Sequence, residues 1–345
     1  MNKAFTLTPL NQRRWQIFKS HKRGYFSLWI FMILFSLSLF AEFIANDKPI
    51  LIYFDQALYT PLFVSYPETT FGGEFKTETV YRDPYVKSLI NSKGWMIWPP
   101  IPFGYETMNF ALTEPAPSPP SLENLIGTDD QTRDVAARLI YGFRLSVLFG
   151  LTLTLVSSVV GVAVGAIQGF YGGKIDLFGQ RFIEIWSSMP RLYLLIILSS
   201  IVIPDFWWLL GILLLFSWMA LVDVVRAEFL RGRNLEYVRA ARALGMVNSR
   251  IIIQHILPNA MVATLTYLPF ILTGAITTLT ALDFLGFGLP PGSPSLGEMV
   301  AQGKANLHAP WLGISAFAVL SLMLTLLVFI GEAARNAFDP RNSAP

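Results

Sequence analysis

The histidines are the residues of this sequence best suited to bind a metal or transfer a proton, and they lie far apart. His21, His255 and His308 fall in separate regions, and none belongs to a pattern such as H-E-x-x-H, which places two imidazoles on one helix face. Cysteine is absent, which excludes thiolate metal sites and a disulfide framework. The sequence therefore predicts neither a metal centre nor a catalytic constellation.

A second feature to test is the run Gly172-Gly173-Lys174, which resembles part of a phosphate-binding loop. The full pattern is G-x-x-x-x-G-K-[ST], but this chain has Gln168 and Ile175 at its two ends. We therefore expect no nucleotide and no other cofactor to be bound by this chain.

Two ionisable side chains lie inside an apolar stretch. Glu184 and Arg191 are seven residues apart and share a helix face, but two turns separate them, so they do not pair directly. Ionisable groups at membrane depth usually face a cavity or the protein interior. Glu184 fits an ordinary position near the water interface. Arg191 follows Pro190 and is our candidate for a charge in a substrate pathway, where it would meet a solute carboxylate.

The composition places these side chains in a membrane protein. Of 345 residues, 53% are hydrophobic and 14% charged, whereas a soluble domain carries about 25% charged residues. Crossing a bilayer takes about 20 apolar residues in a helix. Six stretches qualify: 25–45, 145–170, 183–203, 206–225, 262–282 and 311–331. We predict an all-α integral membrane protein with six transmembrane helices.

The basic residues set the predicted orientation, because cytoplasmic loops are enriched in lysine and arginine. Residues 1–24 contain six basic and no acidic residues, and residues 226–259 contain six arginines against two glutamates. Residues 46–138 contain seven basic and twelve acidic residues. Both termini and the 226–259 loop are therefore expected in the cytoplasm, and the basic surplus indicates topology rather than nucleic-acid binding.

This orientation divides the chain into five parts. They are a cytoplasmic segment (1–24), a first transmembrane helix (25–45), a large extracytoplasmic insert ending in an amphipathic helix (46–138), a five-helix core (139–331) and a cytoplasmic tail (332–345). Within the insert, residues 51–54 and 57–59 are expected to form a hairpin around Asp55-Gln56. Aromatic residues would supply its core: Tyr81, Tyr85, Trp95, Trp98, Phe103, Tyr105 and Phe110. The insert is either a folded plug or a seat for a solute-binding protein.

Two helix features are expected after the insert. A helix is predicted to begin at Gly127-Thr128-Asp129-Asp130, with Thr128 and Gln131 as a capping box and Asp134 and Arg138 as an i, i+4 pair. In the second span, a small residue recurs at every fourth position: Ser157, Gly161, Gly165 and Gly169. Such a face permits close helix contact, either inside this subunit or between subunits.

The most distinctive polar stretch is 234–259, which lies between two apolar spans. Asn234 is expected to cap a helix over 235–244, and Gly245 to end it in the left-handed conformation. Its apolar face would comprise Tyr237, Ala240, Ala241 and Leu244. A second helix over 248–255 would run into Leu257-Pro258. The stretch is either a helix that docks in a partner's groove or an interfacial helix that lies on lipid.

Several of these residues carry a resemblance to a known family. Arg239-Ala240-Ala241, Gly245 and Leu257-Pro258 resemble the EAA loop, the coupling helix of permease subunits of ABC importers. This copy has Arg239 in place of the name-giving glutamate and His255 where isoleucine is usual. Further blocks, at 133–142, 281–288 and 331–341, resemble dipeptide and oligopeptide permeases, and among these the Yej-type peptide and microcin C permeases most.

The resemblance implies a permease subunit, with six helices, a cytoplasmic coupling loop and a periplasmic insert, in the bacterial cell inner membrane. It implies uptake of peptides, with peptide antibiotics such as microcin C as candidate cargo. The implied partners are a second, homologous permease in a heterodimer, an ABC ATPase that uses ATP and Mg²⁺, and a periplasmic peptide-binding protein. The chain itself would not be an enzyme. The alternatives are a secondary transporter or channel for small solutes and a membrane-embedded enzyme, which would need midplane carboxylates or clustered catalytic groups.

Overall fold

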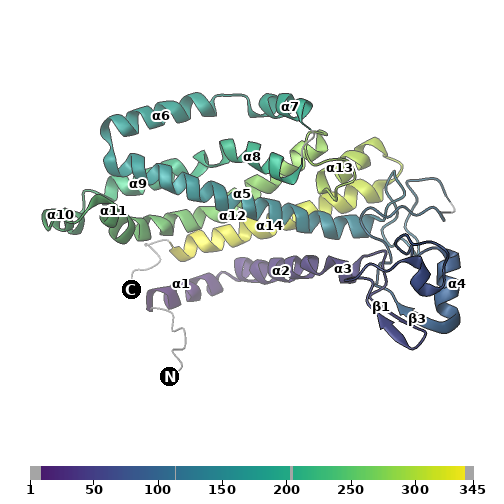
Figure 1. The fold of residues 1–345 in the computed structure, drawn as a ribbon. Helices are drawn as coiled ribbons and strands as arrows, with labels where there is room; N and C mark the ends of the chain where they lie inside the picture. Colours follow the sequence, from purple (N-terminus) through teal and green to yellow (C-terminus); the bar gives the residue numbers. More distant parts are fainter. Residues whose placement is uncertain (1–8, 113, 203–204, 339–345) are drawn as a thin grey trace, which may run out of the picture.

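The computed structural model describes residues 9–112, 114–202 and 205–338, and these are mostly helical (Figure 1). The helices are α1 (Pro9–Ser20), α2 (Lys22–Leu39), α3 (Ala41–Ile44), α4 (Pro84–Lys93), α5 (Val135–Tyr171), α6 (Gly173–Ser187), α7 (Arg191–Ile201), α8 (Phe206–Ser217), α9 (Met219–Gly232), α10 (Glu236–Ala243), α11 (Asn248–Ile251), α12 (Leu257–Phe284), α13 (Leu296–Ala305) and α14 (Pro310–Phe338). The strands are β1 (Leu51–Phe54), β2 (Ala57–Tyr59) and β3 (Gly94–Ile97).

The long helices α2, α5, α12 and α14 lie side by side and separate two polar ends of the molecule (Figure 1). One end carries the insert, which contains the strands and α4, and the same end carries α13. The other end carries α10, α11 and the helix α1. The loop at 226–259 and the insert are therefore separated by the length of the helices.

Four helical stretches in the described residues are long and apolar enough to cross a membrane. They are α5, the α8–α9 pair from Phe206 to Gly232, the stretch Asn248–Phe284, and α14. These contain the predicted spans at 145–170, 206–225, 262–282 and 311–331. The predicted span at 25–45 is also helical, but it is divided into α2 and α3 at Phe40.

The prediction of one continuous helix over 183–203 is wrong. The stretch is interrupted between α6, which ends at Ser187, and α7, which begins at Arg191. Pro190 precedes α7 in an extended conformation, and a proline disfavours helical geometry at the residue before it. Residue 203 lies outside the described part of the chain.

The small residues of α5 form a close contact within this subunit. All four, Ser157, Gly161, Gly165 and Gly169, are buried, and the three glycines lie against α9 and the residue before it. A Cβ atom added at Gly165 would lie 2.7 Å from the Val222 carbonyl oxygen, and one at Gly169 would lie 2.6 Å from the Arg226 carbonyl oxygen. Of the two possibilities left open by the sequence, this face joins two helices of one chain.

A methyl group at Gly165 tests this contact. We expect Gly165→Ala to lower the free energy of unfolding by about 1–3 kcal/mol, because overpacking forces the two helices apart. Gly211→Ala in α8 is the control, because nothing lies within 4 Å of a Cβ atom there. Thermal unfolding of the purified protein in detergent measures both. Equal stability of the two variants would contradict the packing described here.

The insert contains the predicted hairpin. β1 pairs antiparallel with β2, and the connecting residues Asp55 and Gln56 both have positive φ, at 44° and 63°. A two-residue hairpin with two positive φ angles matches the twist of its strands. β3 pairs with the other edge of β1, giving the sheet order β2-β1-β3.

The predicted aromatic core of the insert is partly correct. Tyr81 and Phe103 are buried, and Trp98 and Tyr105 are partly buried, whereas Tyr85, Trp95 and Phe110 are exposed. Buried residues that the prediction lacks complete the core beside the sheet: Ile52, Phe54, Phe71, Val86 and Ile90. The remainder thus comes from β1, α4 and the short helix that ends at Phe71, and it includes two further aromatic residues.

The helix predicted to begin at Gly127 begins instead at Val135. Thr132 has a φ of 64°, which interrupts the right-handed helical conformation. The Asp134 carboxylate caps the helix by accepting a hydrogen bond from the Ala137 amide at 2.8 Å. Thr128 does not form the predicted capping box, because its hydroxyl accepts from the Ser118 amide. Burial raises the pKa of Asp134, against hydrogen bonds from Ala137 and Asn124 that lower it.

A buried cluster of charges replaces the predicted Asp134–Arg138 pair. Arg133 Nε donates to Asp129 Oδ2 at 2.7 Å, and Arg133 Nη2 lies 3.2 Å from Glu298 Oε1. Arg138 Nη2 lies 3.1 Å from Glu298 Oε2 and donates to the Ser293 carbonyl at 3.0 Å. The cluster fixes the start of α5 to α13, which follows it by more than 150 residues.

Asp129 is the fully buried acid of this cluster. We expect Asp129→Asn to cost about 3–5 kcal/mol of stability, because it leaves two buried guanidinium groups short of negative charge. The neighbouring Asp130 is exposed, so Asp130→Asn should change stability by no more than about 0.5 kcal/mol. Thermal unfolding of the two single variants gives the comparison, and similar losses in both would count against a structural role for the cluster.

Candidate functional site

The 226–259 loop contains the short helix predicted from the sequence, and its end has the predicted geometry. α10 ends at Ala243, and Gly245 has a φ of 77°. The Met246 amide donates to the Ala241 carbonyl at 3.1 Å and the Gly245 amide donates to the Arg242 carbonyl at 3.0 Å, which is the Schellman motif. Gly245 therefore stops the helix and turns the chain towards α11.

The start of α10 differs from the prediction. Leu235 rather than Asn234 is the N-terminal flanking residue, and it provides no side-chain cap. The Asn234 amide group instead donates to the Leu230 carbonyl at 3.1 Å. Asn234 therefore ends the preceding helix α9 rather than starting α10.

The apolar residues of α10 divide between two faces. Ala241 is buried, together with Val238, in a cluster that includes Phe170, Phe229 and Ile251. Tyr237, Ala240 and Leu244 are exposed, and Leu244 has 87% of its surface accessible. The prediction of one face with all four residues is thus wrong for Ala241, which attaches the helix to its own chain. Ala240 and Leu244 are exposed outside this cluster, while Tyr237 is exposed but contacts Asn259 of α12 through its hydroxyl.

The predicted second helix continues into the membrane stretch. α11 is followed by a π-helical turn at Ile252–Ile256, and α12 begins at Leu257. Pro258 lies in the first turn of α12 and has no backbone N–H, so the regular i→i−4 ladder cannot pass through it. Leu257-Pro258 therefore marks a change of helical geometry within one continuous helical stretch.

Two contacts tie α10 to the neighbouring helices, and a third joins α9 to the π-helical turn before α12. The Asn259 amide group donates to the Tyr237 hydroxyl at 3.3 Å, joining α12 to α10. Ile256 packs on Gly232 at the end of α9, and the guanidinium of Arg242 lies 5.6 Å from the centre of the Phe170 ring on α5. Asn259 was not among the predicted site residues. The only sequence signal for Asn259 is that a polar residue directly follows Leu257-Pro258.

The loop is strongly basic, and part of this charge is paired within the chain. Arg226 makes a two-point ion pair with Asp176 of α6, with Nε–Oδ1 and Nη2–Oδ2 distances of 2.5 and 2.7 Å. Arg239 is exposed, and its side chain forms no ion pair with the residues that the structure describes. Its charge faces solvent.

Arg191 and Glu184 do not form a pair, but the prediction that they share one helix face is wrong. Glu184 pairs with Arg181 at 2.6 Å on the exposed surface of α6. Arg191 is the first residue of α7, is exposed, and lies 5.8 Å from the centre of the Phe216 ring. The break at Pro190 places Arg191 at a helix start, so the two side chains are on different helices.

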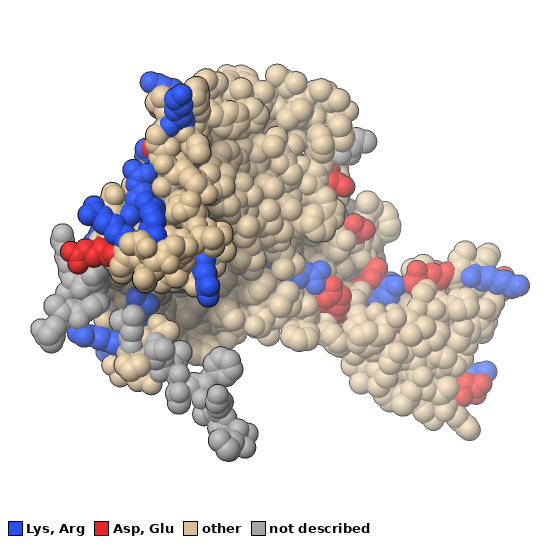
Figure 2. Space-filling model, turned by 60° about the vertical axis from the view of Figure 1, so that its left-hand side comes forward, with Lys and Arg blue, Asp and Glu red and all other residues tan. Residues whose placement is uncertain are grey.

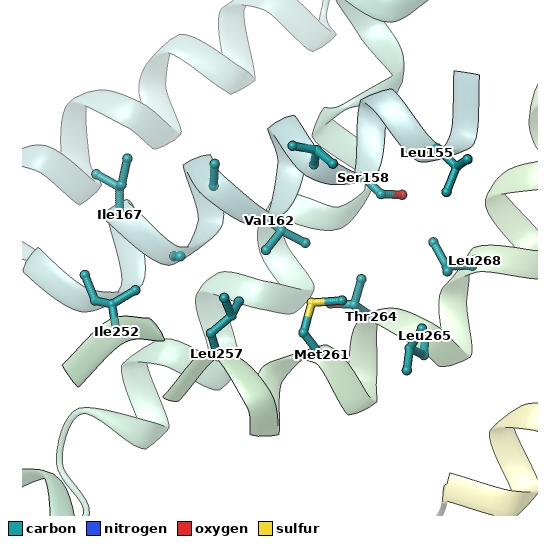
Figure 3. Close-up of a pocket in the computed structure, with 13 residues that line it drawn as sticks. Leu155, Ser158, Val162, Ile167, Ile252, Leu257, Met261, Thr264, Leu265 and Leu268 are labelled. Atoms are coloured by element: carbon teal, nitrogen blue, oxygen red, sulfur yellow. The ribbon is translucent and has the colours of Figure 1, made fainter. Parts of the chain in front are cut away.

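An apolar groove of about 560 Å³ lies between α5 and the α11–α12 stretch (Figure 3). Ser158 and Thr264 are its polar lining residues, and Val162, Leu257 and Met261 face one another across it. The lining has no charged group. In the described residues there is also no group of three or more histidine, aspartate or glutamate side chains that could hold a metal ion.

Comparison with protein families identifies both parts of the chain. Residues 161–344, more than half of the sequence, match the family described as binding-protein-dependent transport system inner membrane component. Residues 8–70 match the N-terminal transmembrane domain of oligopeptide transport permease C. The first match contains the loop, α12 and α14. The match over residues 8–70 contains α1, α2, α3 and the β1–β2 hairpin.

Related proteins extend the match to nearly the whole chain. The sequence is 60% identical to the inner membrane ABC transporter permease protein YejE of Escherichia coli, over 98% of this chain and 99% of that protein. It is 59% identical to the peptidoglycan transport system permease protein YejE of Agrobacterium fabrum, over 97% and 94% of the two chains. An oligopeptide transport system permease protein OppC of Lactococcus lactis is 34% identical over 64% of this chain and 76% of its own length. The chain therefore belongs to the family of binding-protein-dependent transport system inner membrane components and is a permease subunit of the ABC transporter type.

Proposed function

We propose that this subunit forms part of the pathway by which a binding-protein-dependent importer carries peptides into the cytoplasm. The names of relatives support this substrate class: they include oligopeptide permeases and a permease of a peptidoglycan transport system, whose cargo contains peptide. The partner ATPase of the complex hydrolyses ATP, and the permease converts that hydrolysis into movement of its helices. ATP and Mg²⁺ bind to the partner rather than to this chain.

The observation that carries the proposal is the exposed tip of the 226–259 loop. Tyr237, Leu244 and Val247 are exposed apolar residues surrounded by arginines, and α10 lies beyond the ends of α12 and α14 (Figure 1). A helix that rests on lipid would keep its apolar face at the membrane surface. α10 instead buries one face in its own chain and presents another outward, which suits a groove in a cytoplasmic protein.

The contacts behind the loop provide a route for force. Val238 and Ala241 are packed among Phe170 of α5 and Phe229 of α9, and Asn259 joins the helix to α12. A displacement of α10 by the ATPase would move the ends of these three helices together. Packed elements of this kind move as rigid bodies, which is the motion required for alternating access.

The charges at the two ends support the orientation that we propose. Lysine and arginine gather at the end with α10, while acidic residues are more frequent at the end with the insert (Figure 2). By the positive-inside rule, α10 and both chain termini lie in the cytoplasm and the insert in the periplasm. We propose that α2 with α3, and α6 with α7, complete six crossings of the inner membrane.

The apolar surfaces of this chain suit a second permease. α6 exposes a row of large apolar side chains, including Leu177, Phe178 and Phe182, and its contacts within the chain are mainly with α5. The groove in Figure 3 is also lined almost entirely by apolar residues. A homologous partner in a heterodimer would cover both, and the periplasmic peptide-binding protein would dock on the opposite side of the membrane from α10.

Leu244 gives a direct test of ATPase docking. We expect Leu244→Glu to weaken retention of the partner ATPase about 30-fold or more, because a buried hot-spot side chain contributes 2 kcal/mol or more to binding. Its folding should not suffer, since Leu244 is already exposed. Leu122→Glu, at a fully exposed leucine of the insert, is the control. Co-purification from detergent, with both variants inserted in the membrane, is the measurement.

Two outcomes would contradict the proposal. Retention of the ATPase by Leu244→Glu at the wild-type level would remove the exposed face of α10 from the interface. Peptide uptake that continues without ATP would favour a secondary transporter. Loss of binding in Leu244→Glu alone would support docking whatever the transported substrate proves to be.

Arg191 gives a separate test of the substrate pathway. If its guanidinium meets a peptide carboxylate, Arg191→Ala should reduce uptake about tenfold, equivalent to roughly 1.4 kcal/mol, and Arg191→Lys should restore part of it. Arg181→Ala, which removes an exposed arginine of α6, is the control. Uptake of a labelled peptide into proteoliposomes is the measurement. Unchanged uptake in Arg191→Ala would exclude this residue from the pathway.

A further inference from the structure

One face of α2 is a continuous exposed apolar stripe. Its members recur at helical spacing along α2 up to the residue that follows it: Phe26, Trp29, Ile30, Ile33, Leu37 and Phe40. The opposite face is packed inside the protein, where Gly24, Ser27, Phe31 and Ser38 are buried. An apolar stripe opposite a packed face is the surface that a peripheral transmembrane helix presents to lipid.

The stripe does not stop at the end of the helix. The Phe40 ring lies 6.3 Å from that of Phe43 in α3, and the Phe43 ring lies 5.9 Å from that of Phe63. Phe63 belongs to the insert, is 72% exposed, and is followed by the exposed Val64. The backbone turns tightly there, because the Phe63 and Val64 amides both donate to the Thr60 carbonyl. This turn extends the apolar surface of the helix onto the insert.

The length of the stripe matches the thickness of a bilayer. Tyr25 and Phe43 are eighteen positions apart, and at 1.5 Å per residue this corresponds to about 27 Å along a helix. The hydrocarbon core is about 30 Å thick, and aromatic side chains are enriched at both of its borders. Tyr25 and Trp29 thus lie near one border when Phe43 and Phe63 lie near the other.

The insert is also placed to reach the membrane surface. In Figure 1, its strands are displaced from the end of α3 on the side away from α14, beyond the edge of the helical bundle. With α2 and α3 crossing the membrane as proposed, the surface under this overhang would be lipid. The exposed phenylalanine therefore points to a contact that the subunit makes outside its own fold.

We propose that the turn at residues 60–64 is a lipid contact, in which Phe63 inserts at the headgroup level of the outer leaflet and holds the insert on the membrane surface. The ligand is the phospholipid bilayer itself, through its acyl and headgroup border, with no requirement for a particular headgroup. The contact fixes the height and tilt of the insert relative to the helices. It rests on the proposed crossing of the membrane by α2 and α3.

The absence of cysteine makes this proposal directly testable. Single cysteines at Phe63, Val64, Leu37 and Phe75 are labelled with a nitroxide in the assembled transporter in nanodiscs. Collision of the label with oxygen, which concentrates in lipid, is then compared with collision with a water-soluble nickel chelate. Leu37 reports the lipid-facing side of α2, and Phe75 is an exposed phenylalanine elsewhere on the insert.

The expected result is a lipid-like ratio of the two collision rates at 37, 63 and 64, and a water-like ratio at 75. A water-like ratio at 63 and 64 with a lipid-like ratio at 37 would overturn the contact while leaving the membrane crossing intact. Protection of 63 from both reagents would also overturn it, because a protein partner would then cover the turn. A water-like ratio at 37 would remove its basis, the crossing by α2.

Discussion

The close approach of α5 and α9 is the contact on which the position of the 226–259 loop depends. A small residue at every fourth position lets the α5 backbone lie against the carbonyl oxygens of α9, at distances that leave no room for a Cβ atom. Moving an apolar side chain from lipid into a helix interface gives little hydrophobic free energy. Close packing of this kind is therefore a principal source of helix association in a membrane. The same approach brings Phe170 and Phe229 together at the end that carries α10. Val238 and Ala241 of α10 are buried in the cluster that these two rings begin.

Sequence patterns predicted the features that depend on neighbours along the chain. The left-handed Gly245 and the hairpin at Asp55-Gln56 follow from local backbone preferences, and the small face of α5 follows from helical spacing. The apolar length of α5, α12 and α14 was similarly evident. Periodicity did not reveal which of the two possible surfaces the small face would contact, because the pattern is the same for both.

The wrong predictions concern contacts between distant parts of the chain. Arg138 was expected to pair with Asp134, four residues away, but it meets Glu298, which arrives from α13. Asp134 is committed to capping α5 instead. The Ser295-x-x-Glu298 spacing is a capping-box signal for the start of α13, and the Ser295 hydroxyl does accept from the Glu298 amide. This spacing predicts where α13 begins, but it does not predict which residues the Glu298 carboxylate pairs with. Likewise, the spacing of Ala241 with Tyr237 and Leu244 describes an apolar face, while tertiary packing decides that Ala241 alone is covered.

The length of α5 connects the two ends of the molecule. Its 37 residues correspond to about 55 Å, nearly twice the 30 Å of a typical hydrocarbon core. One end is held to α13 by the buried charges, and the other contributes Phe170 to the base of the 226–259 loop. A helix with both ends fixed by packing or charge transmits rotation and tilt better than it absorbs them, because side chains in a packed core have few alternative arrangements. Movement imposed at α10 would therefore reach the end that carries the insert through α5 itself.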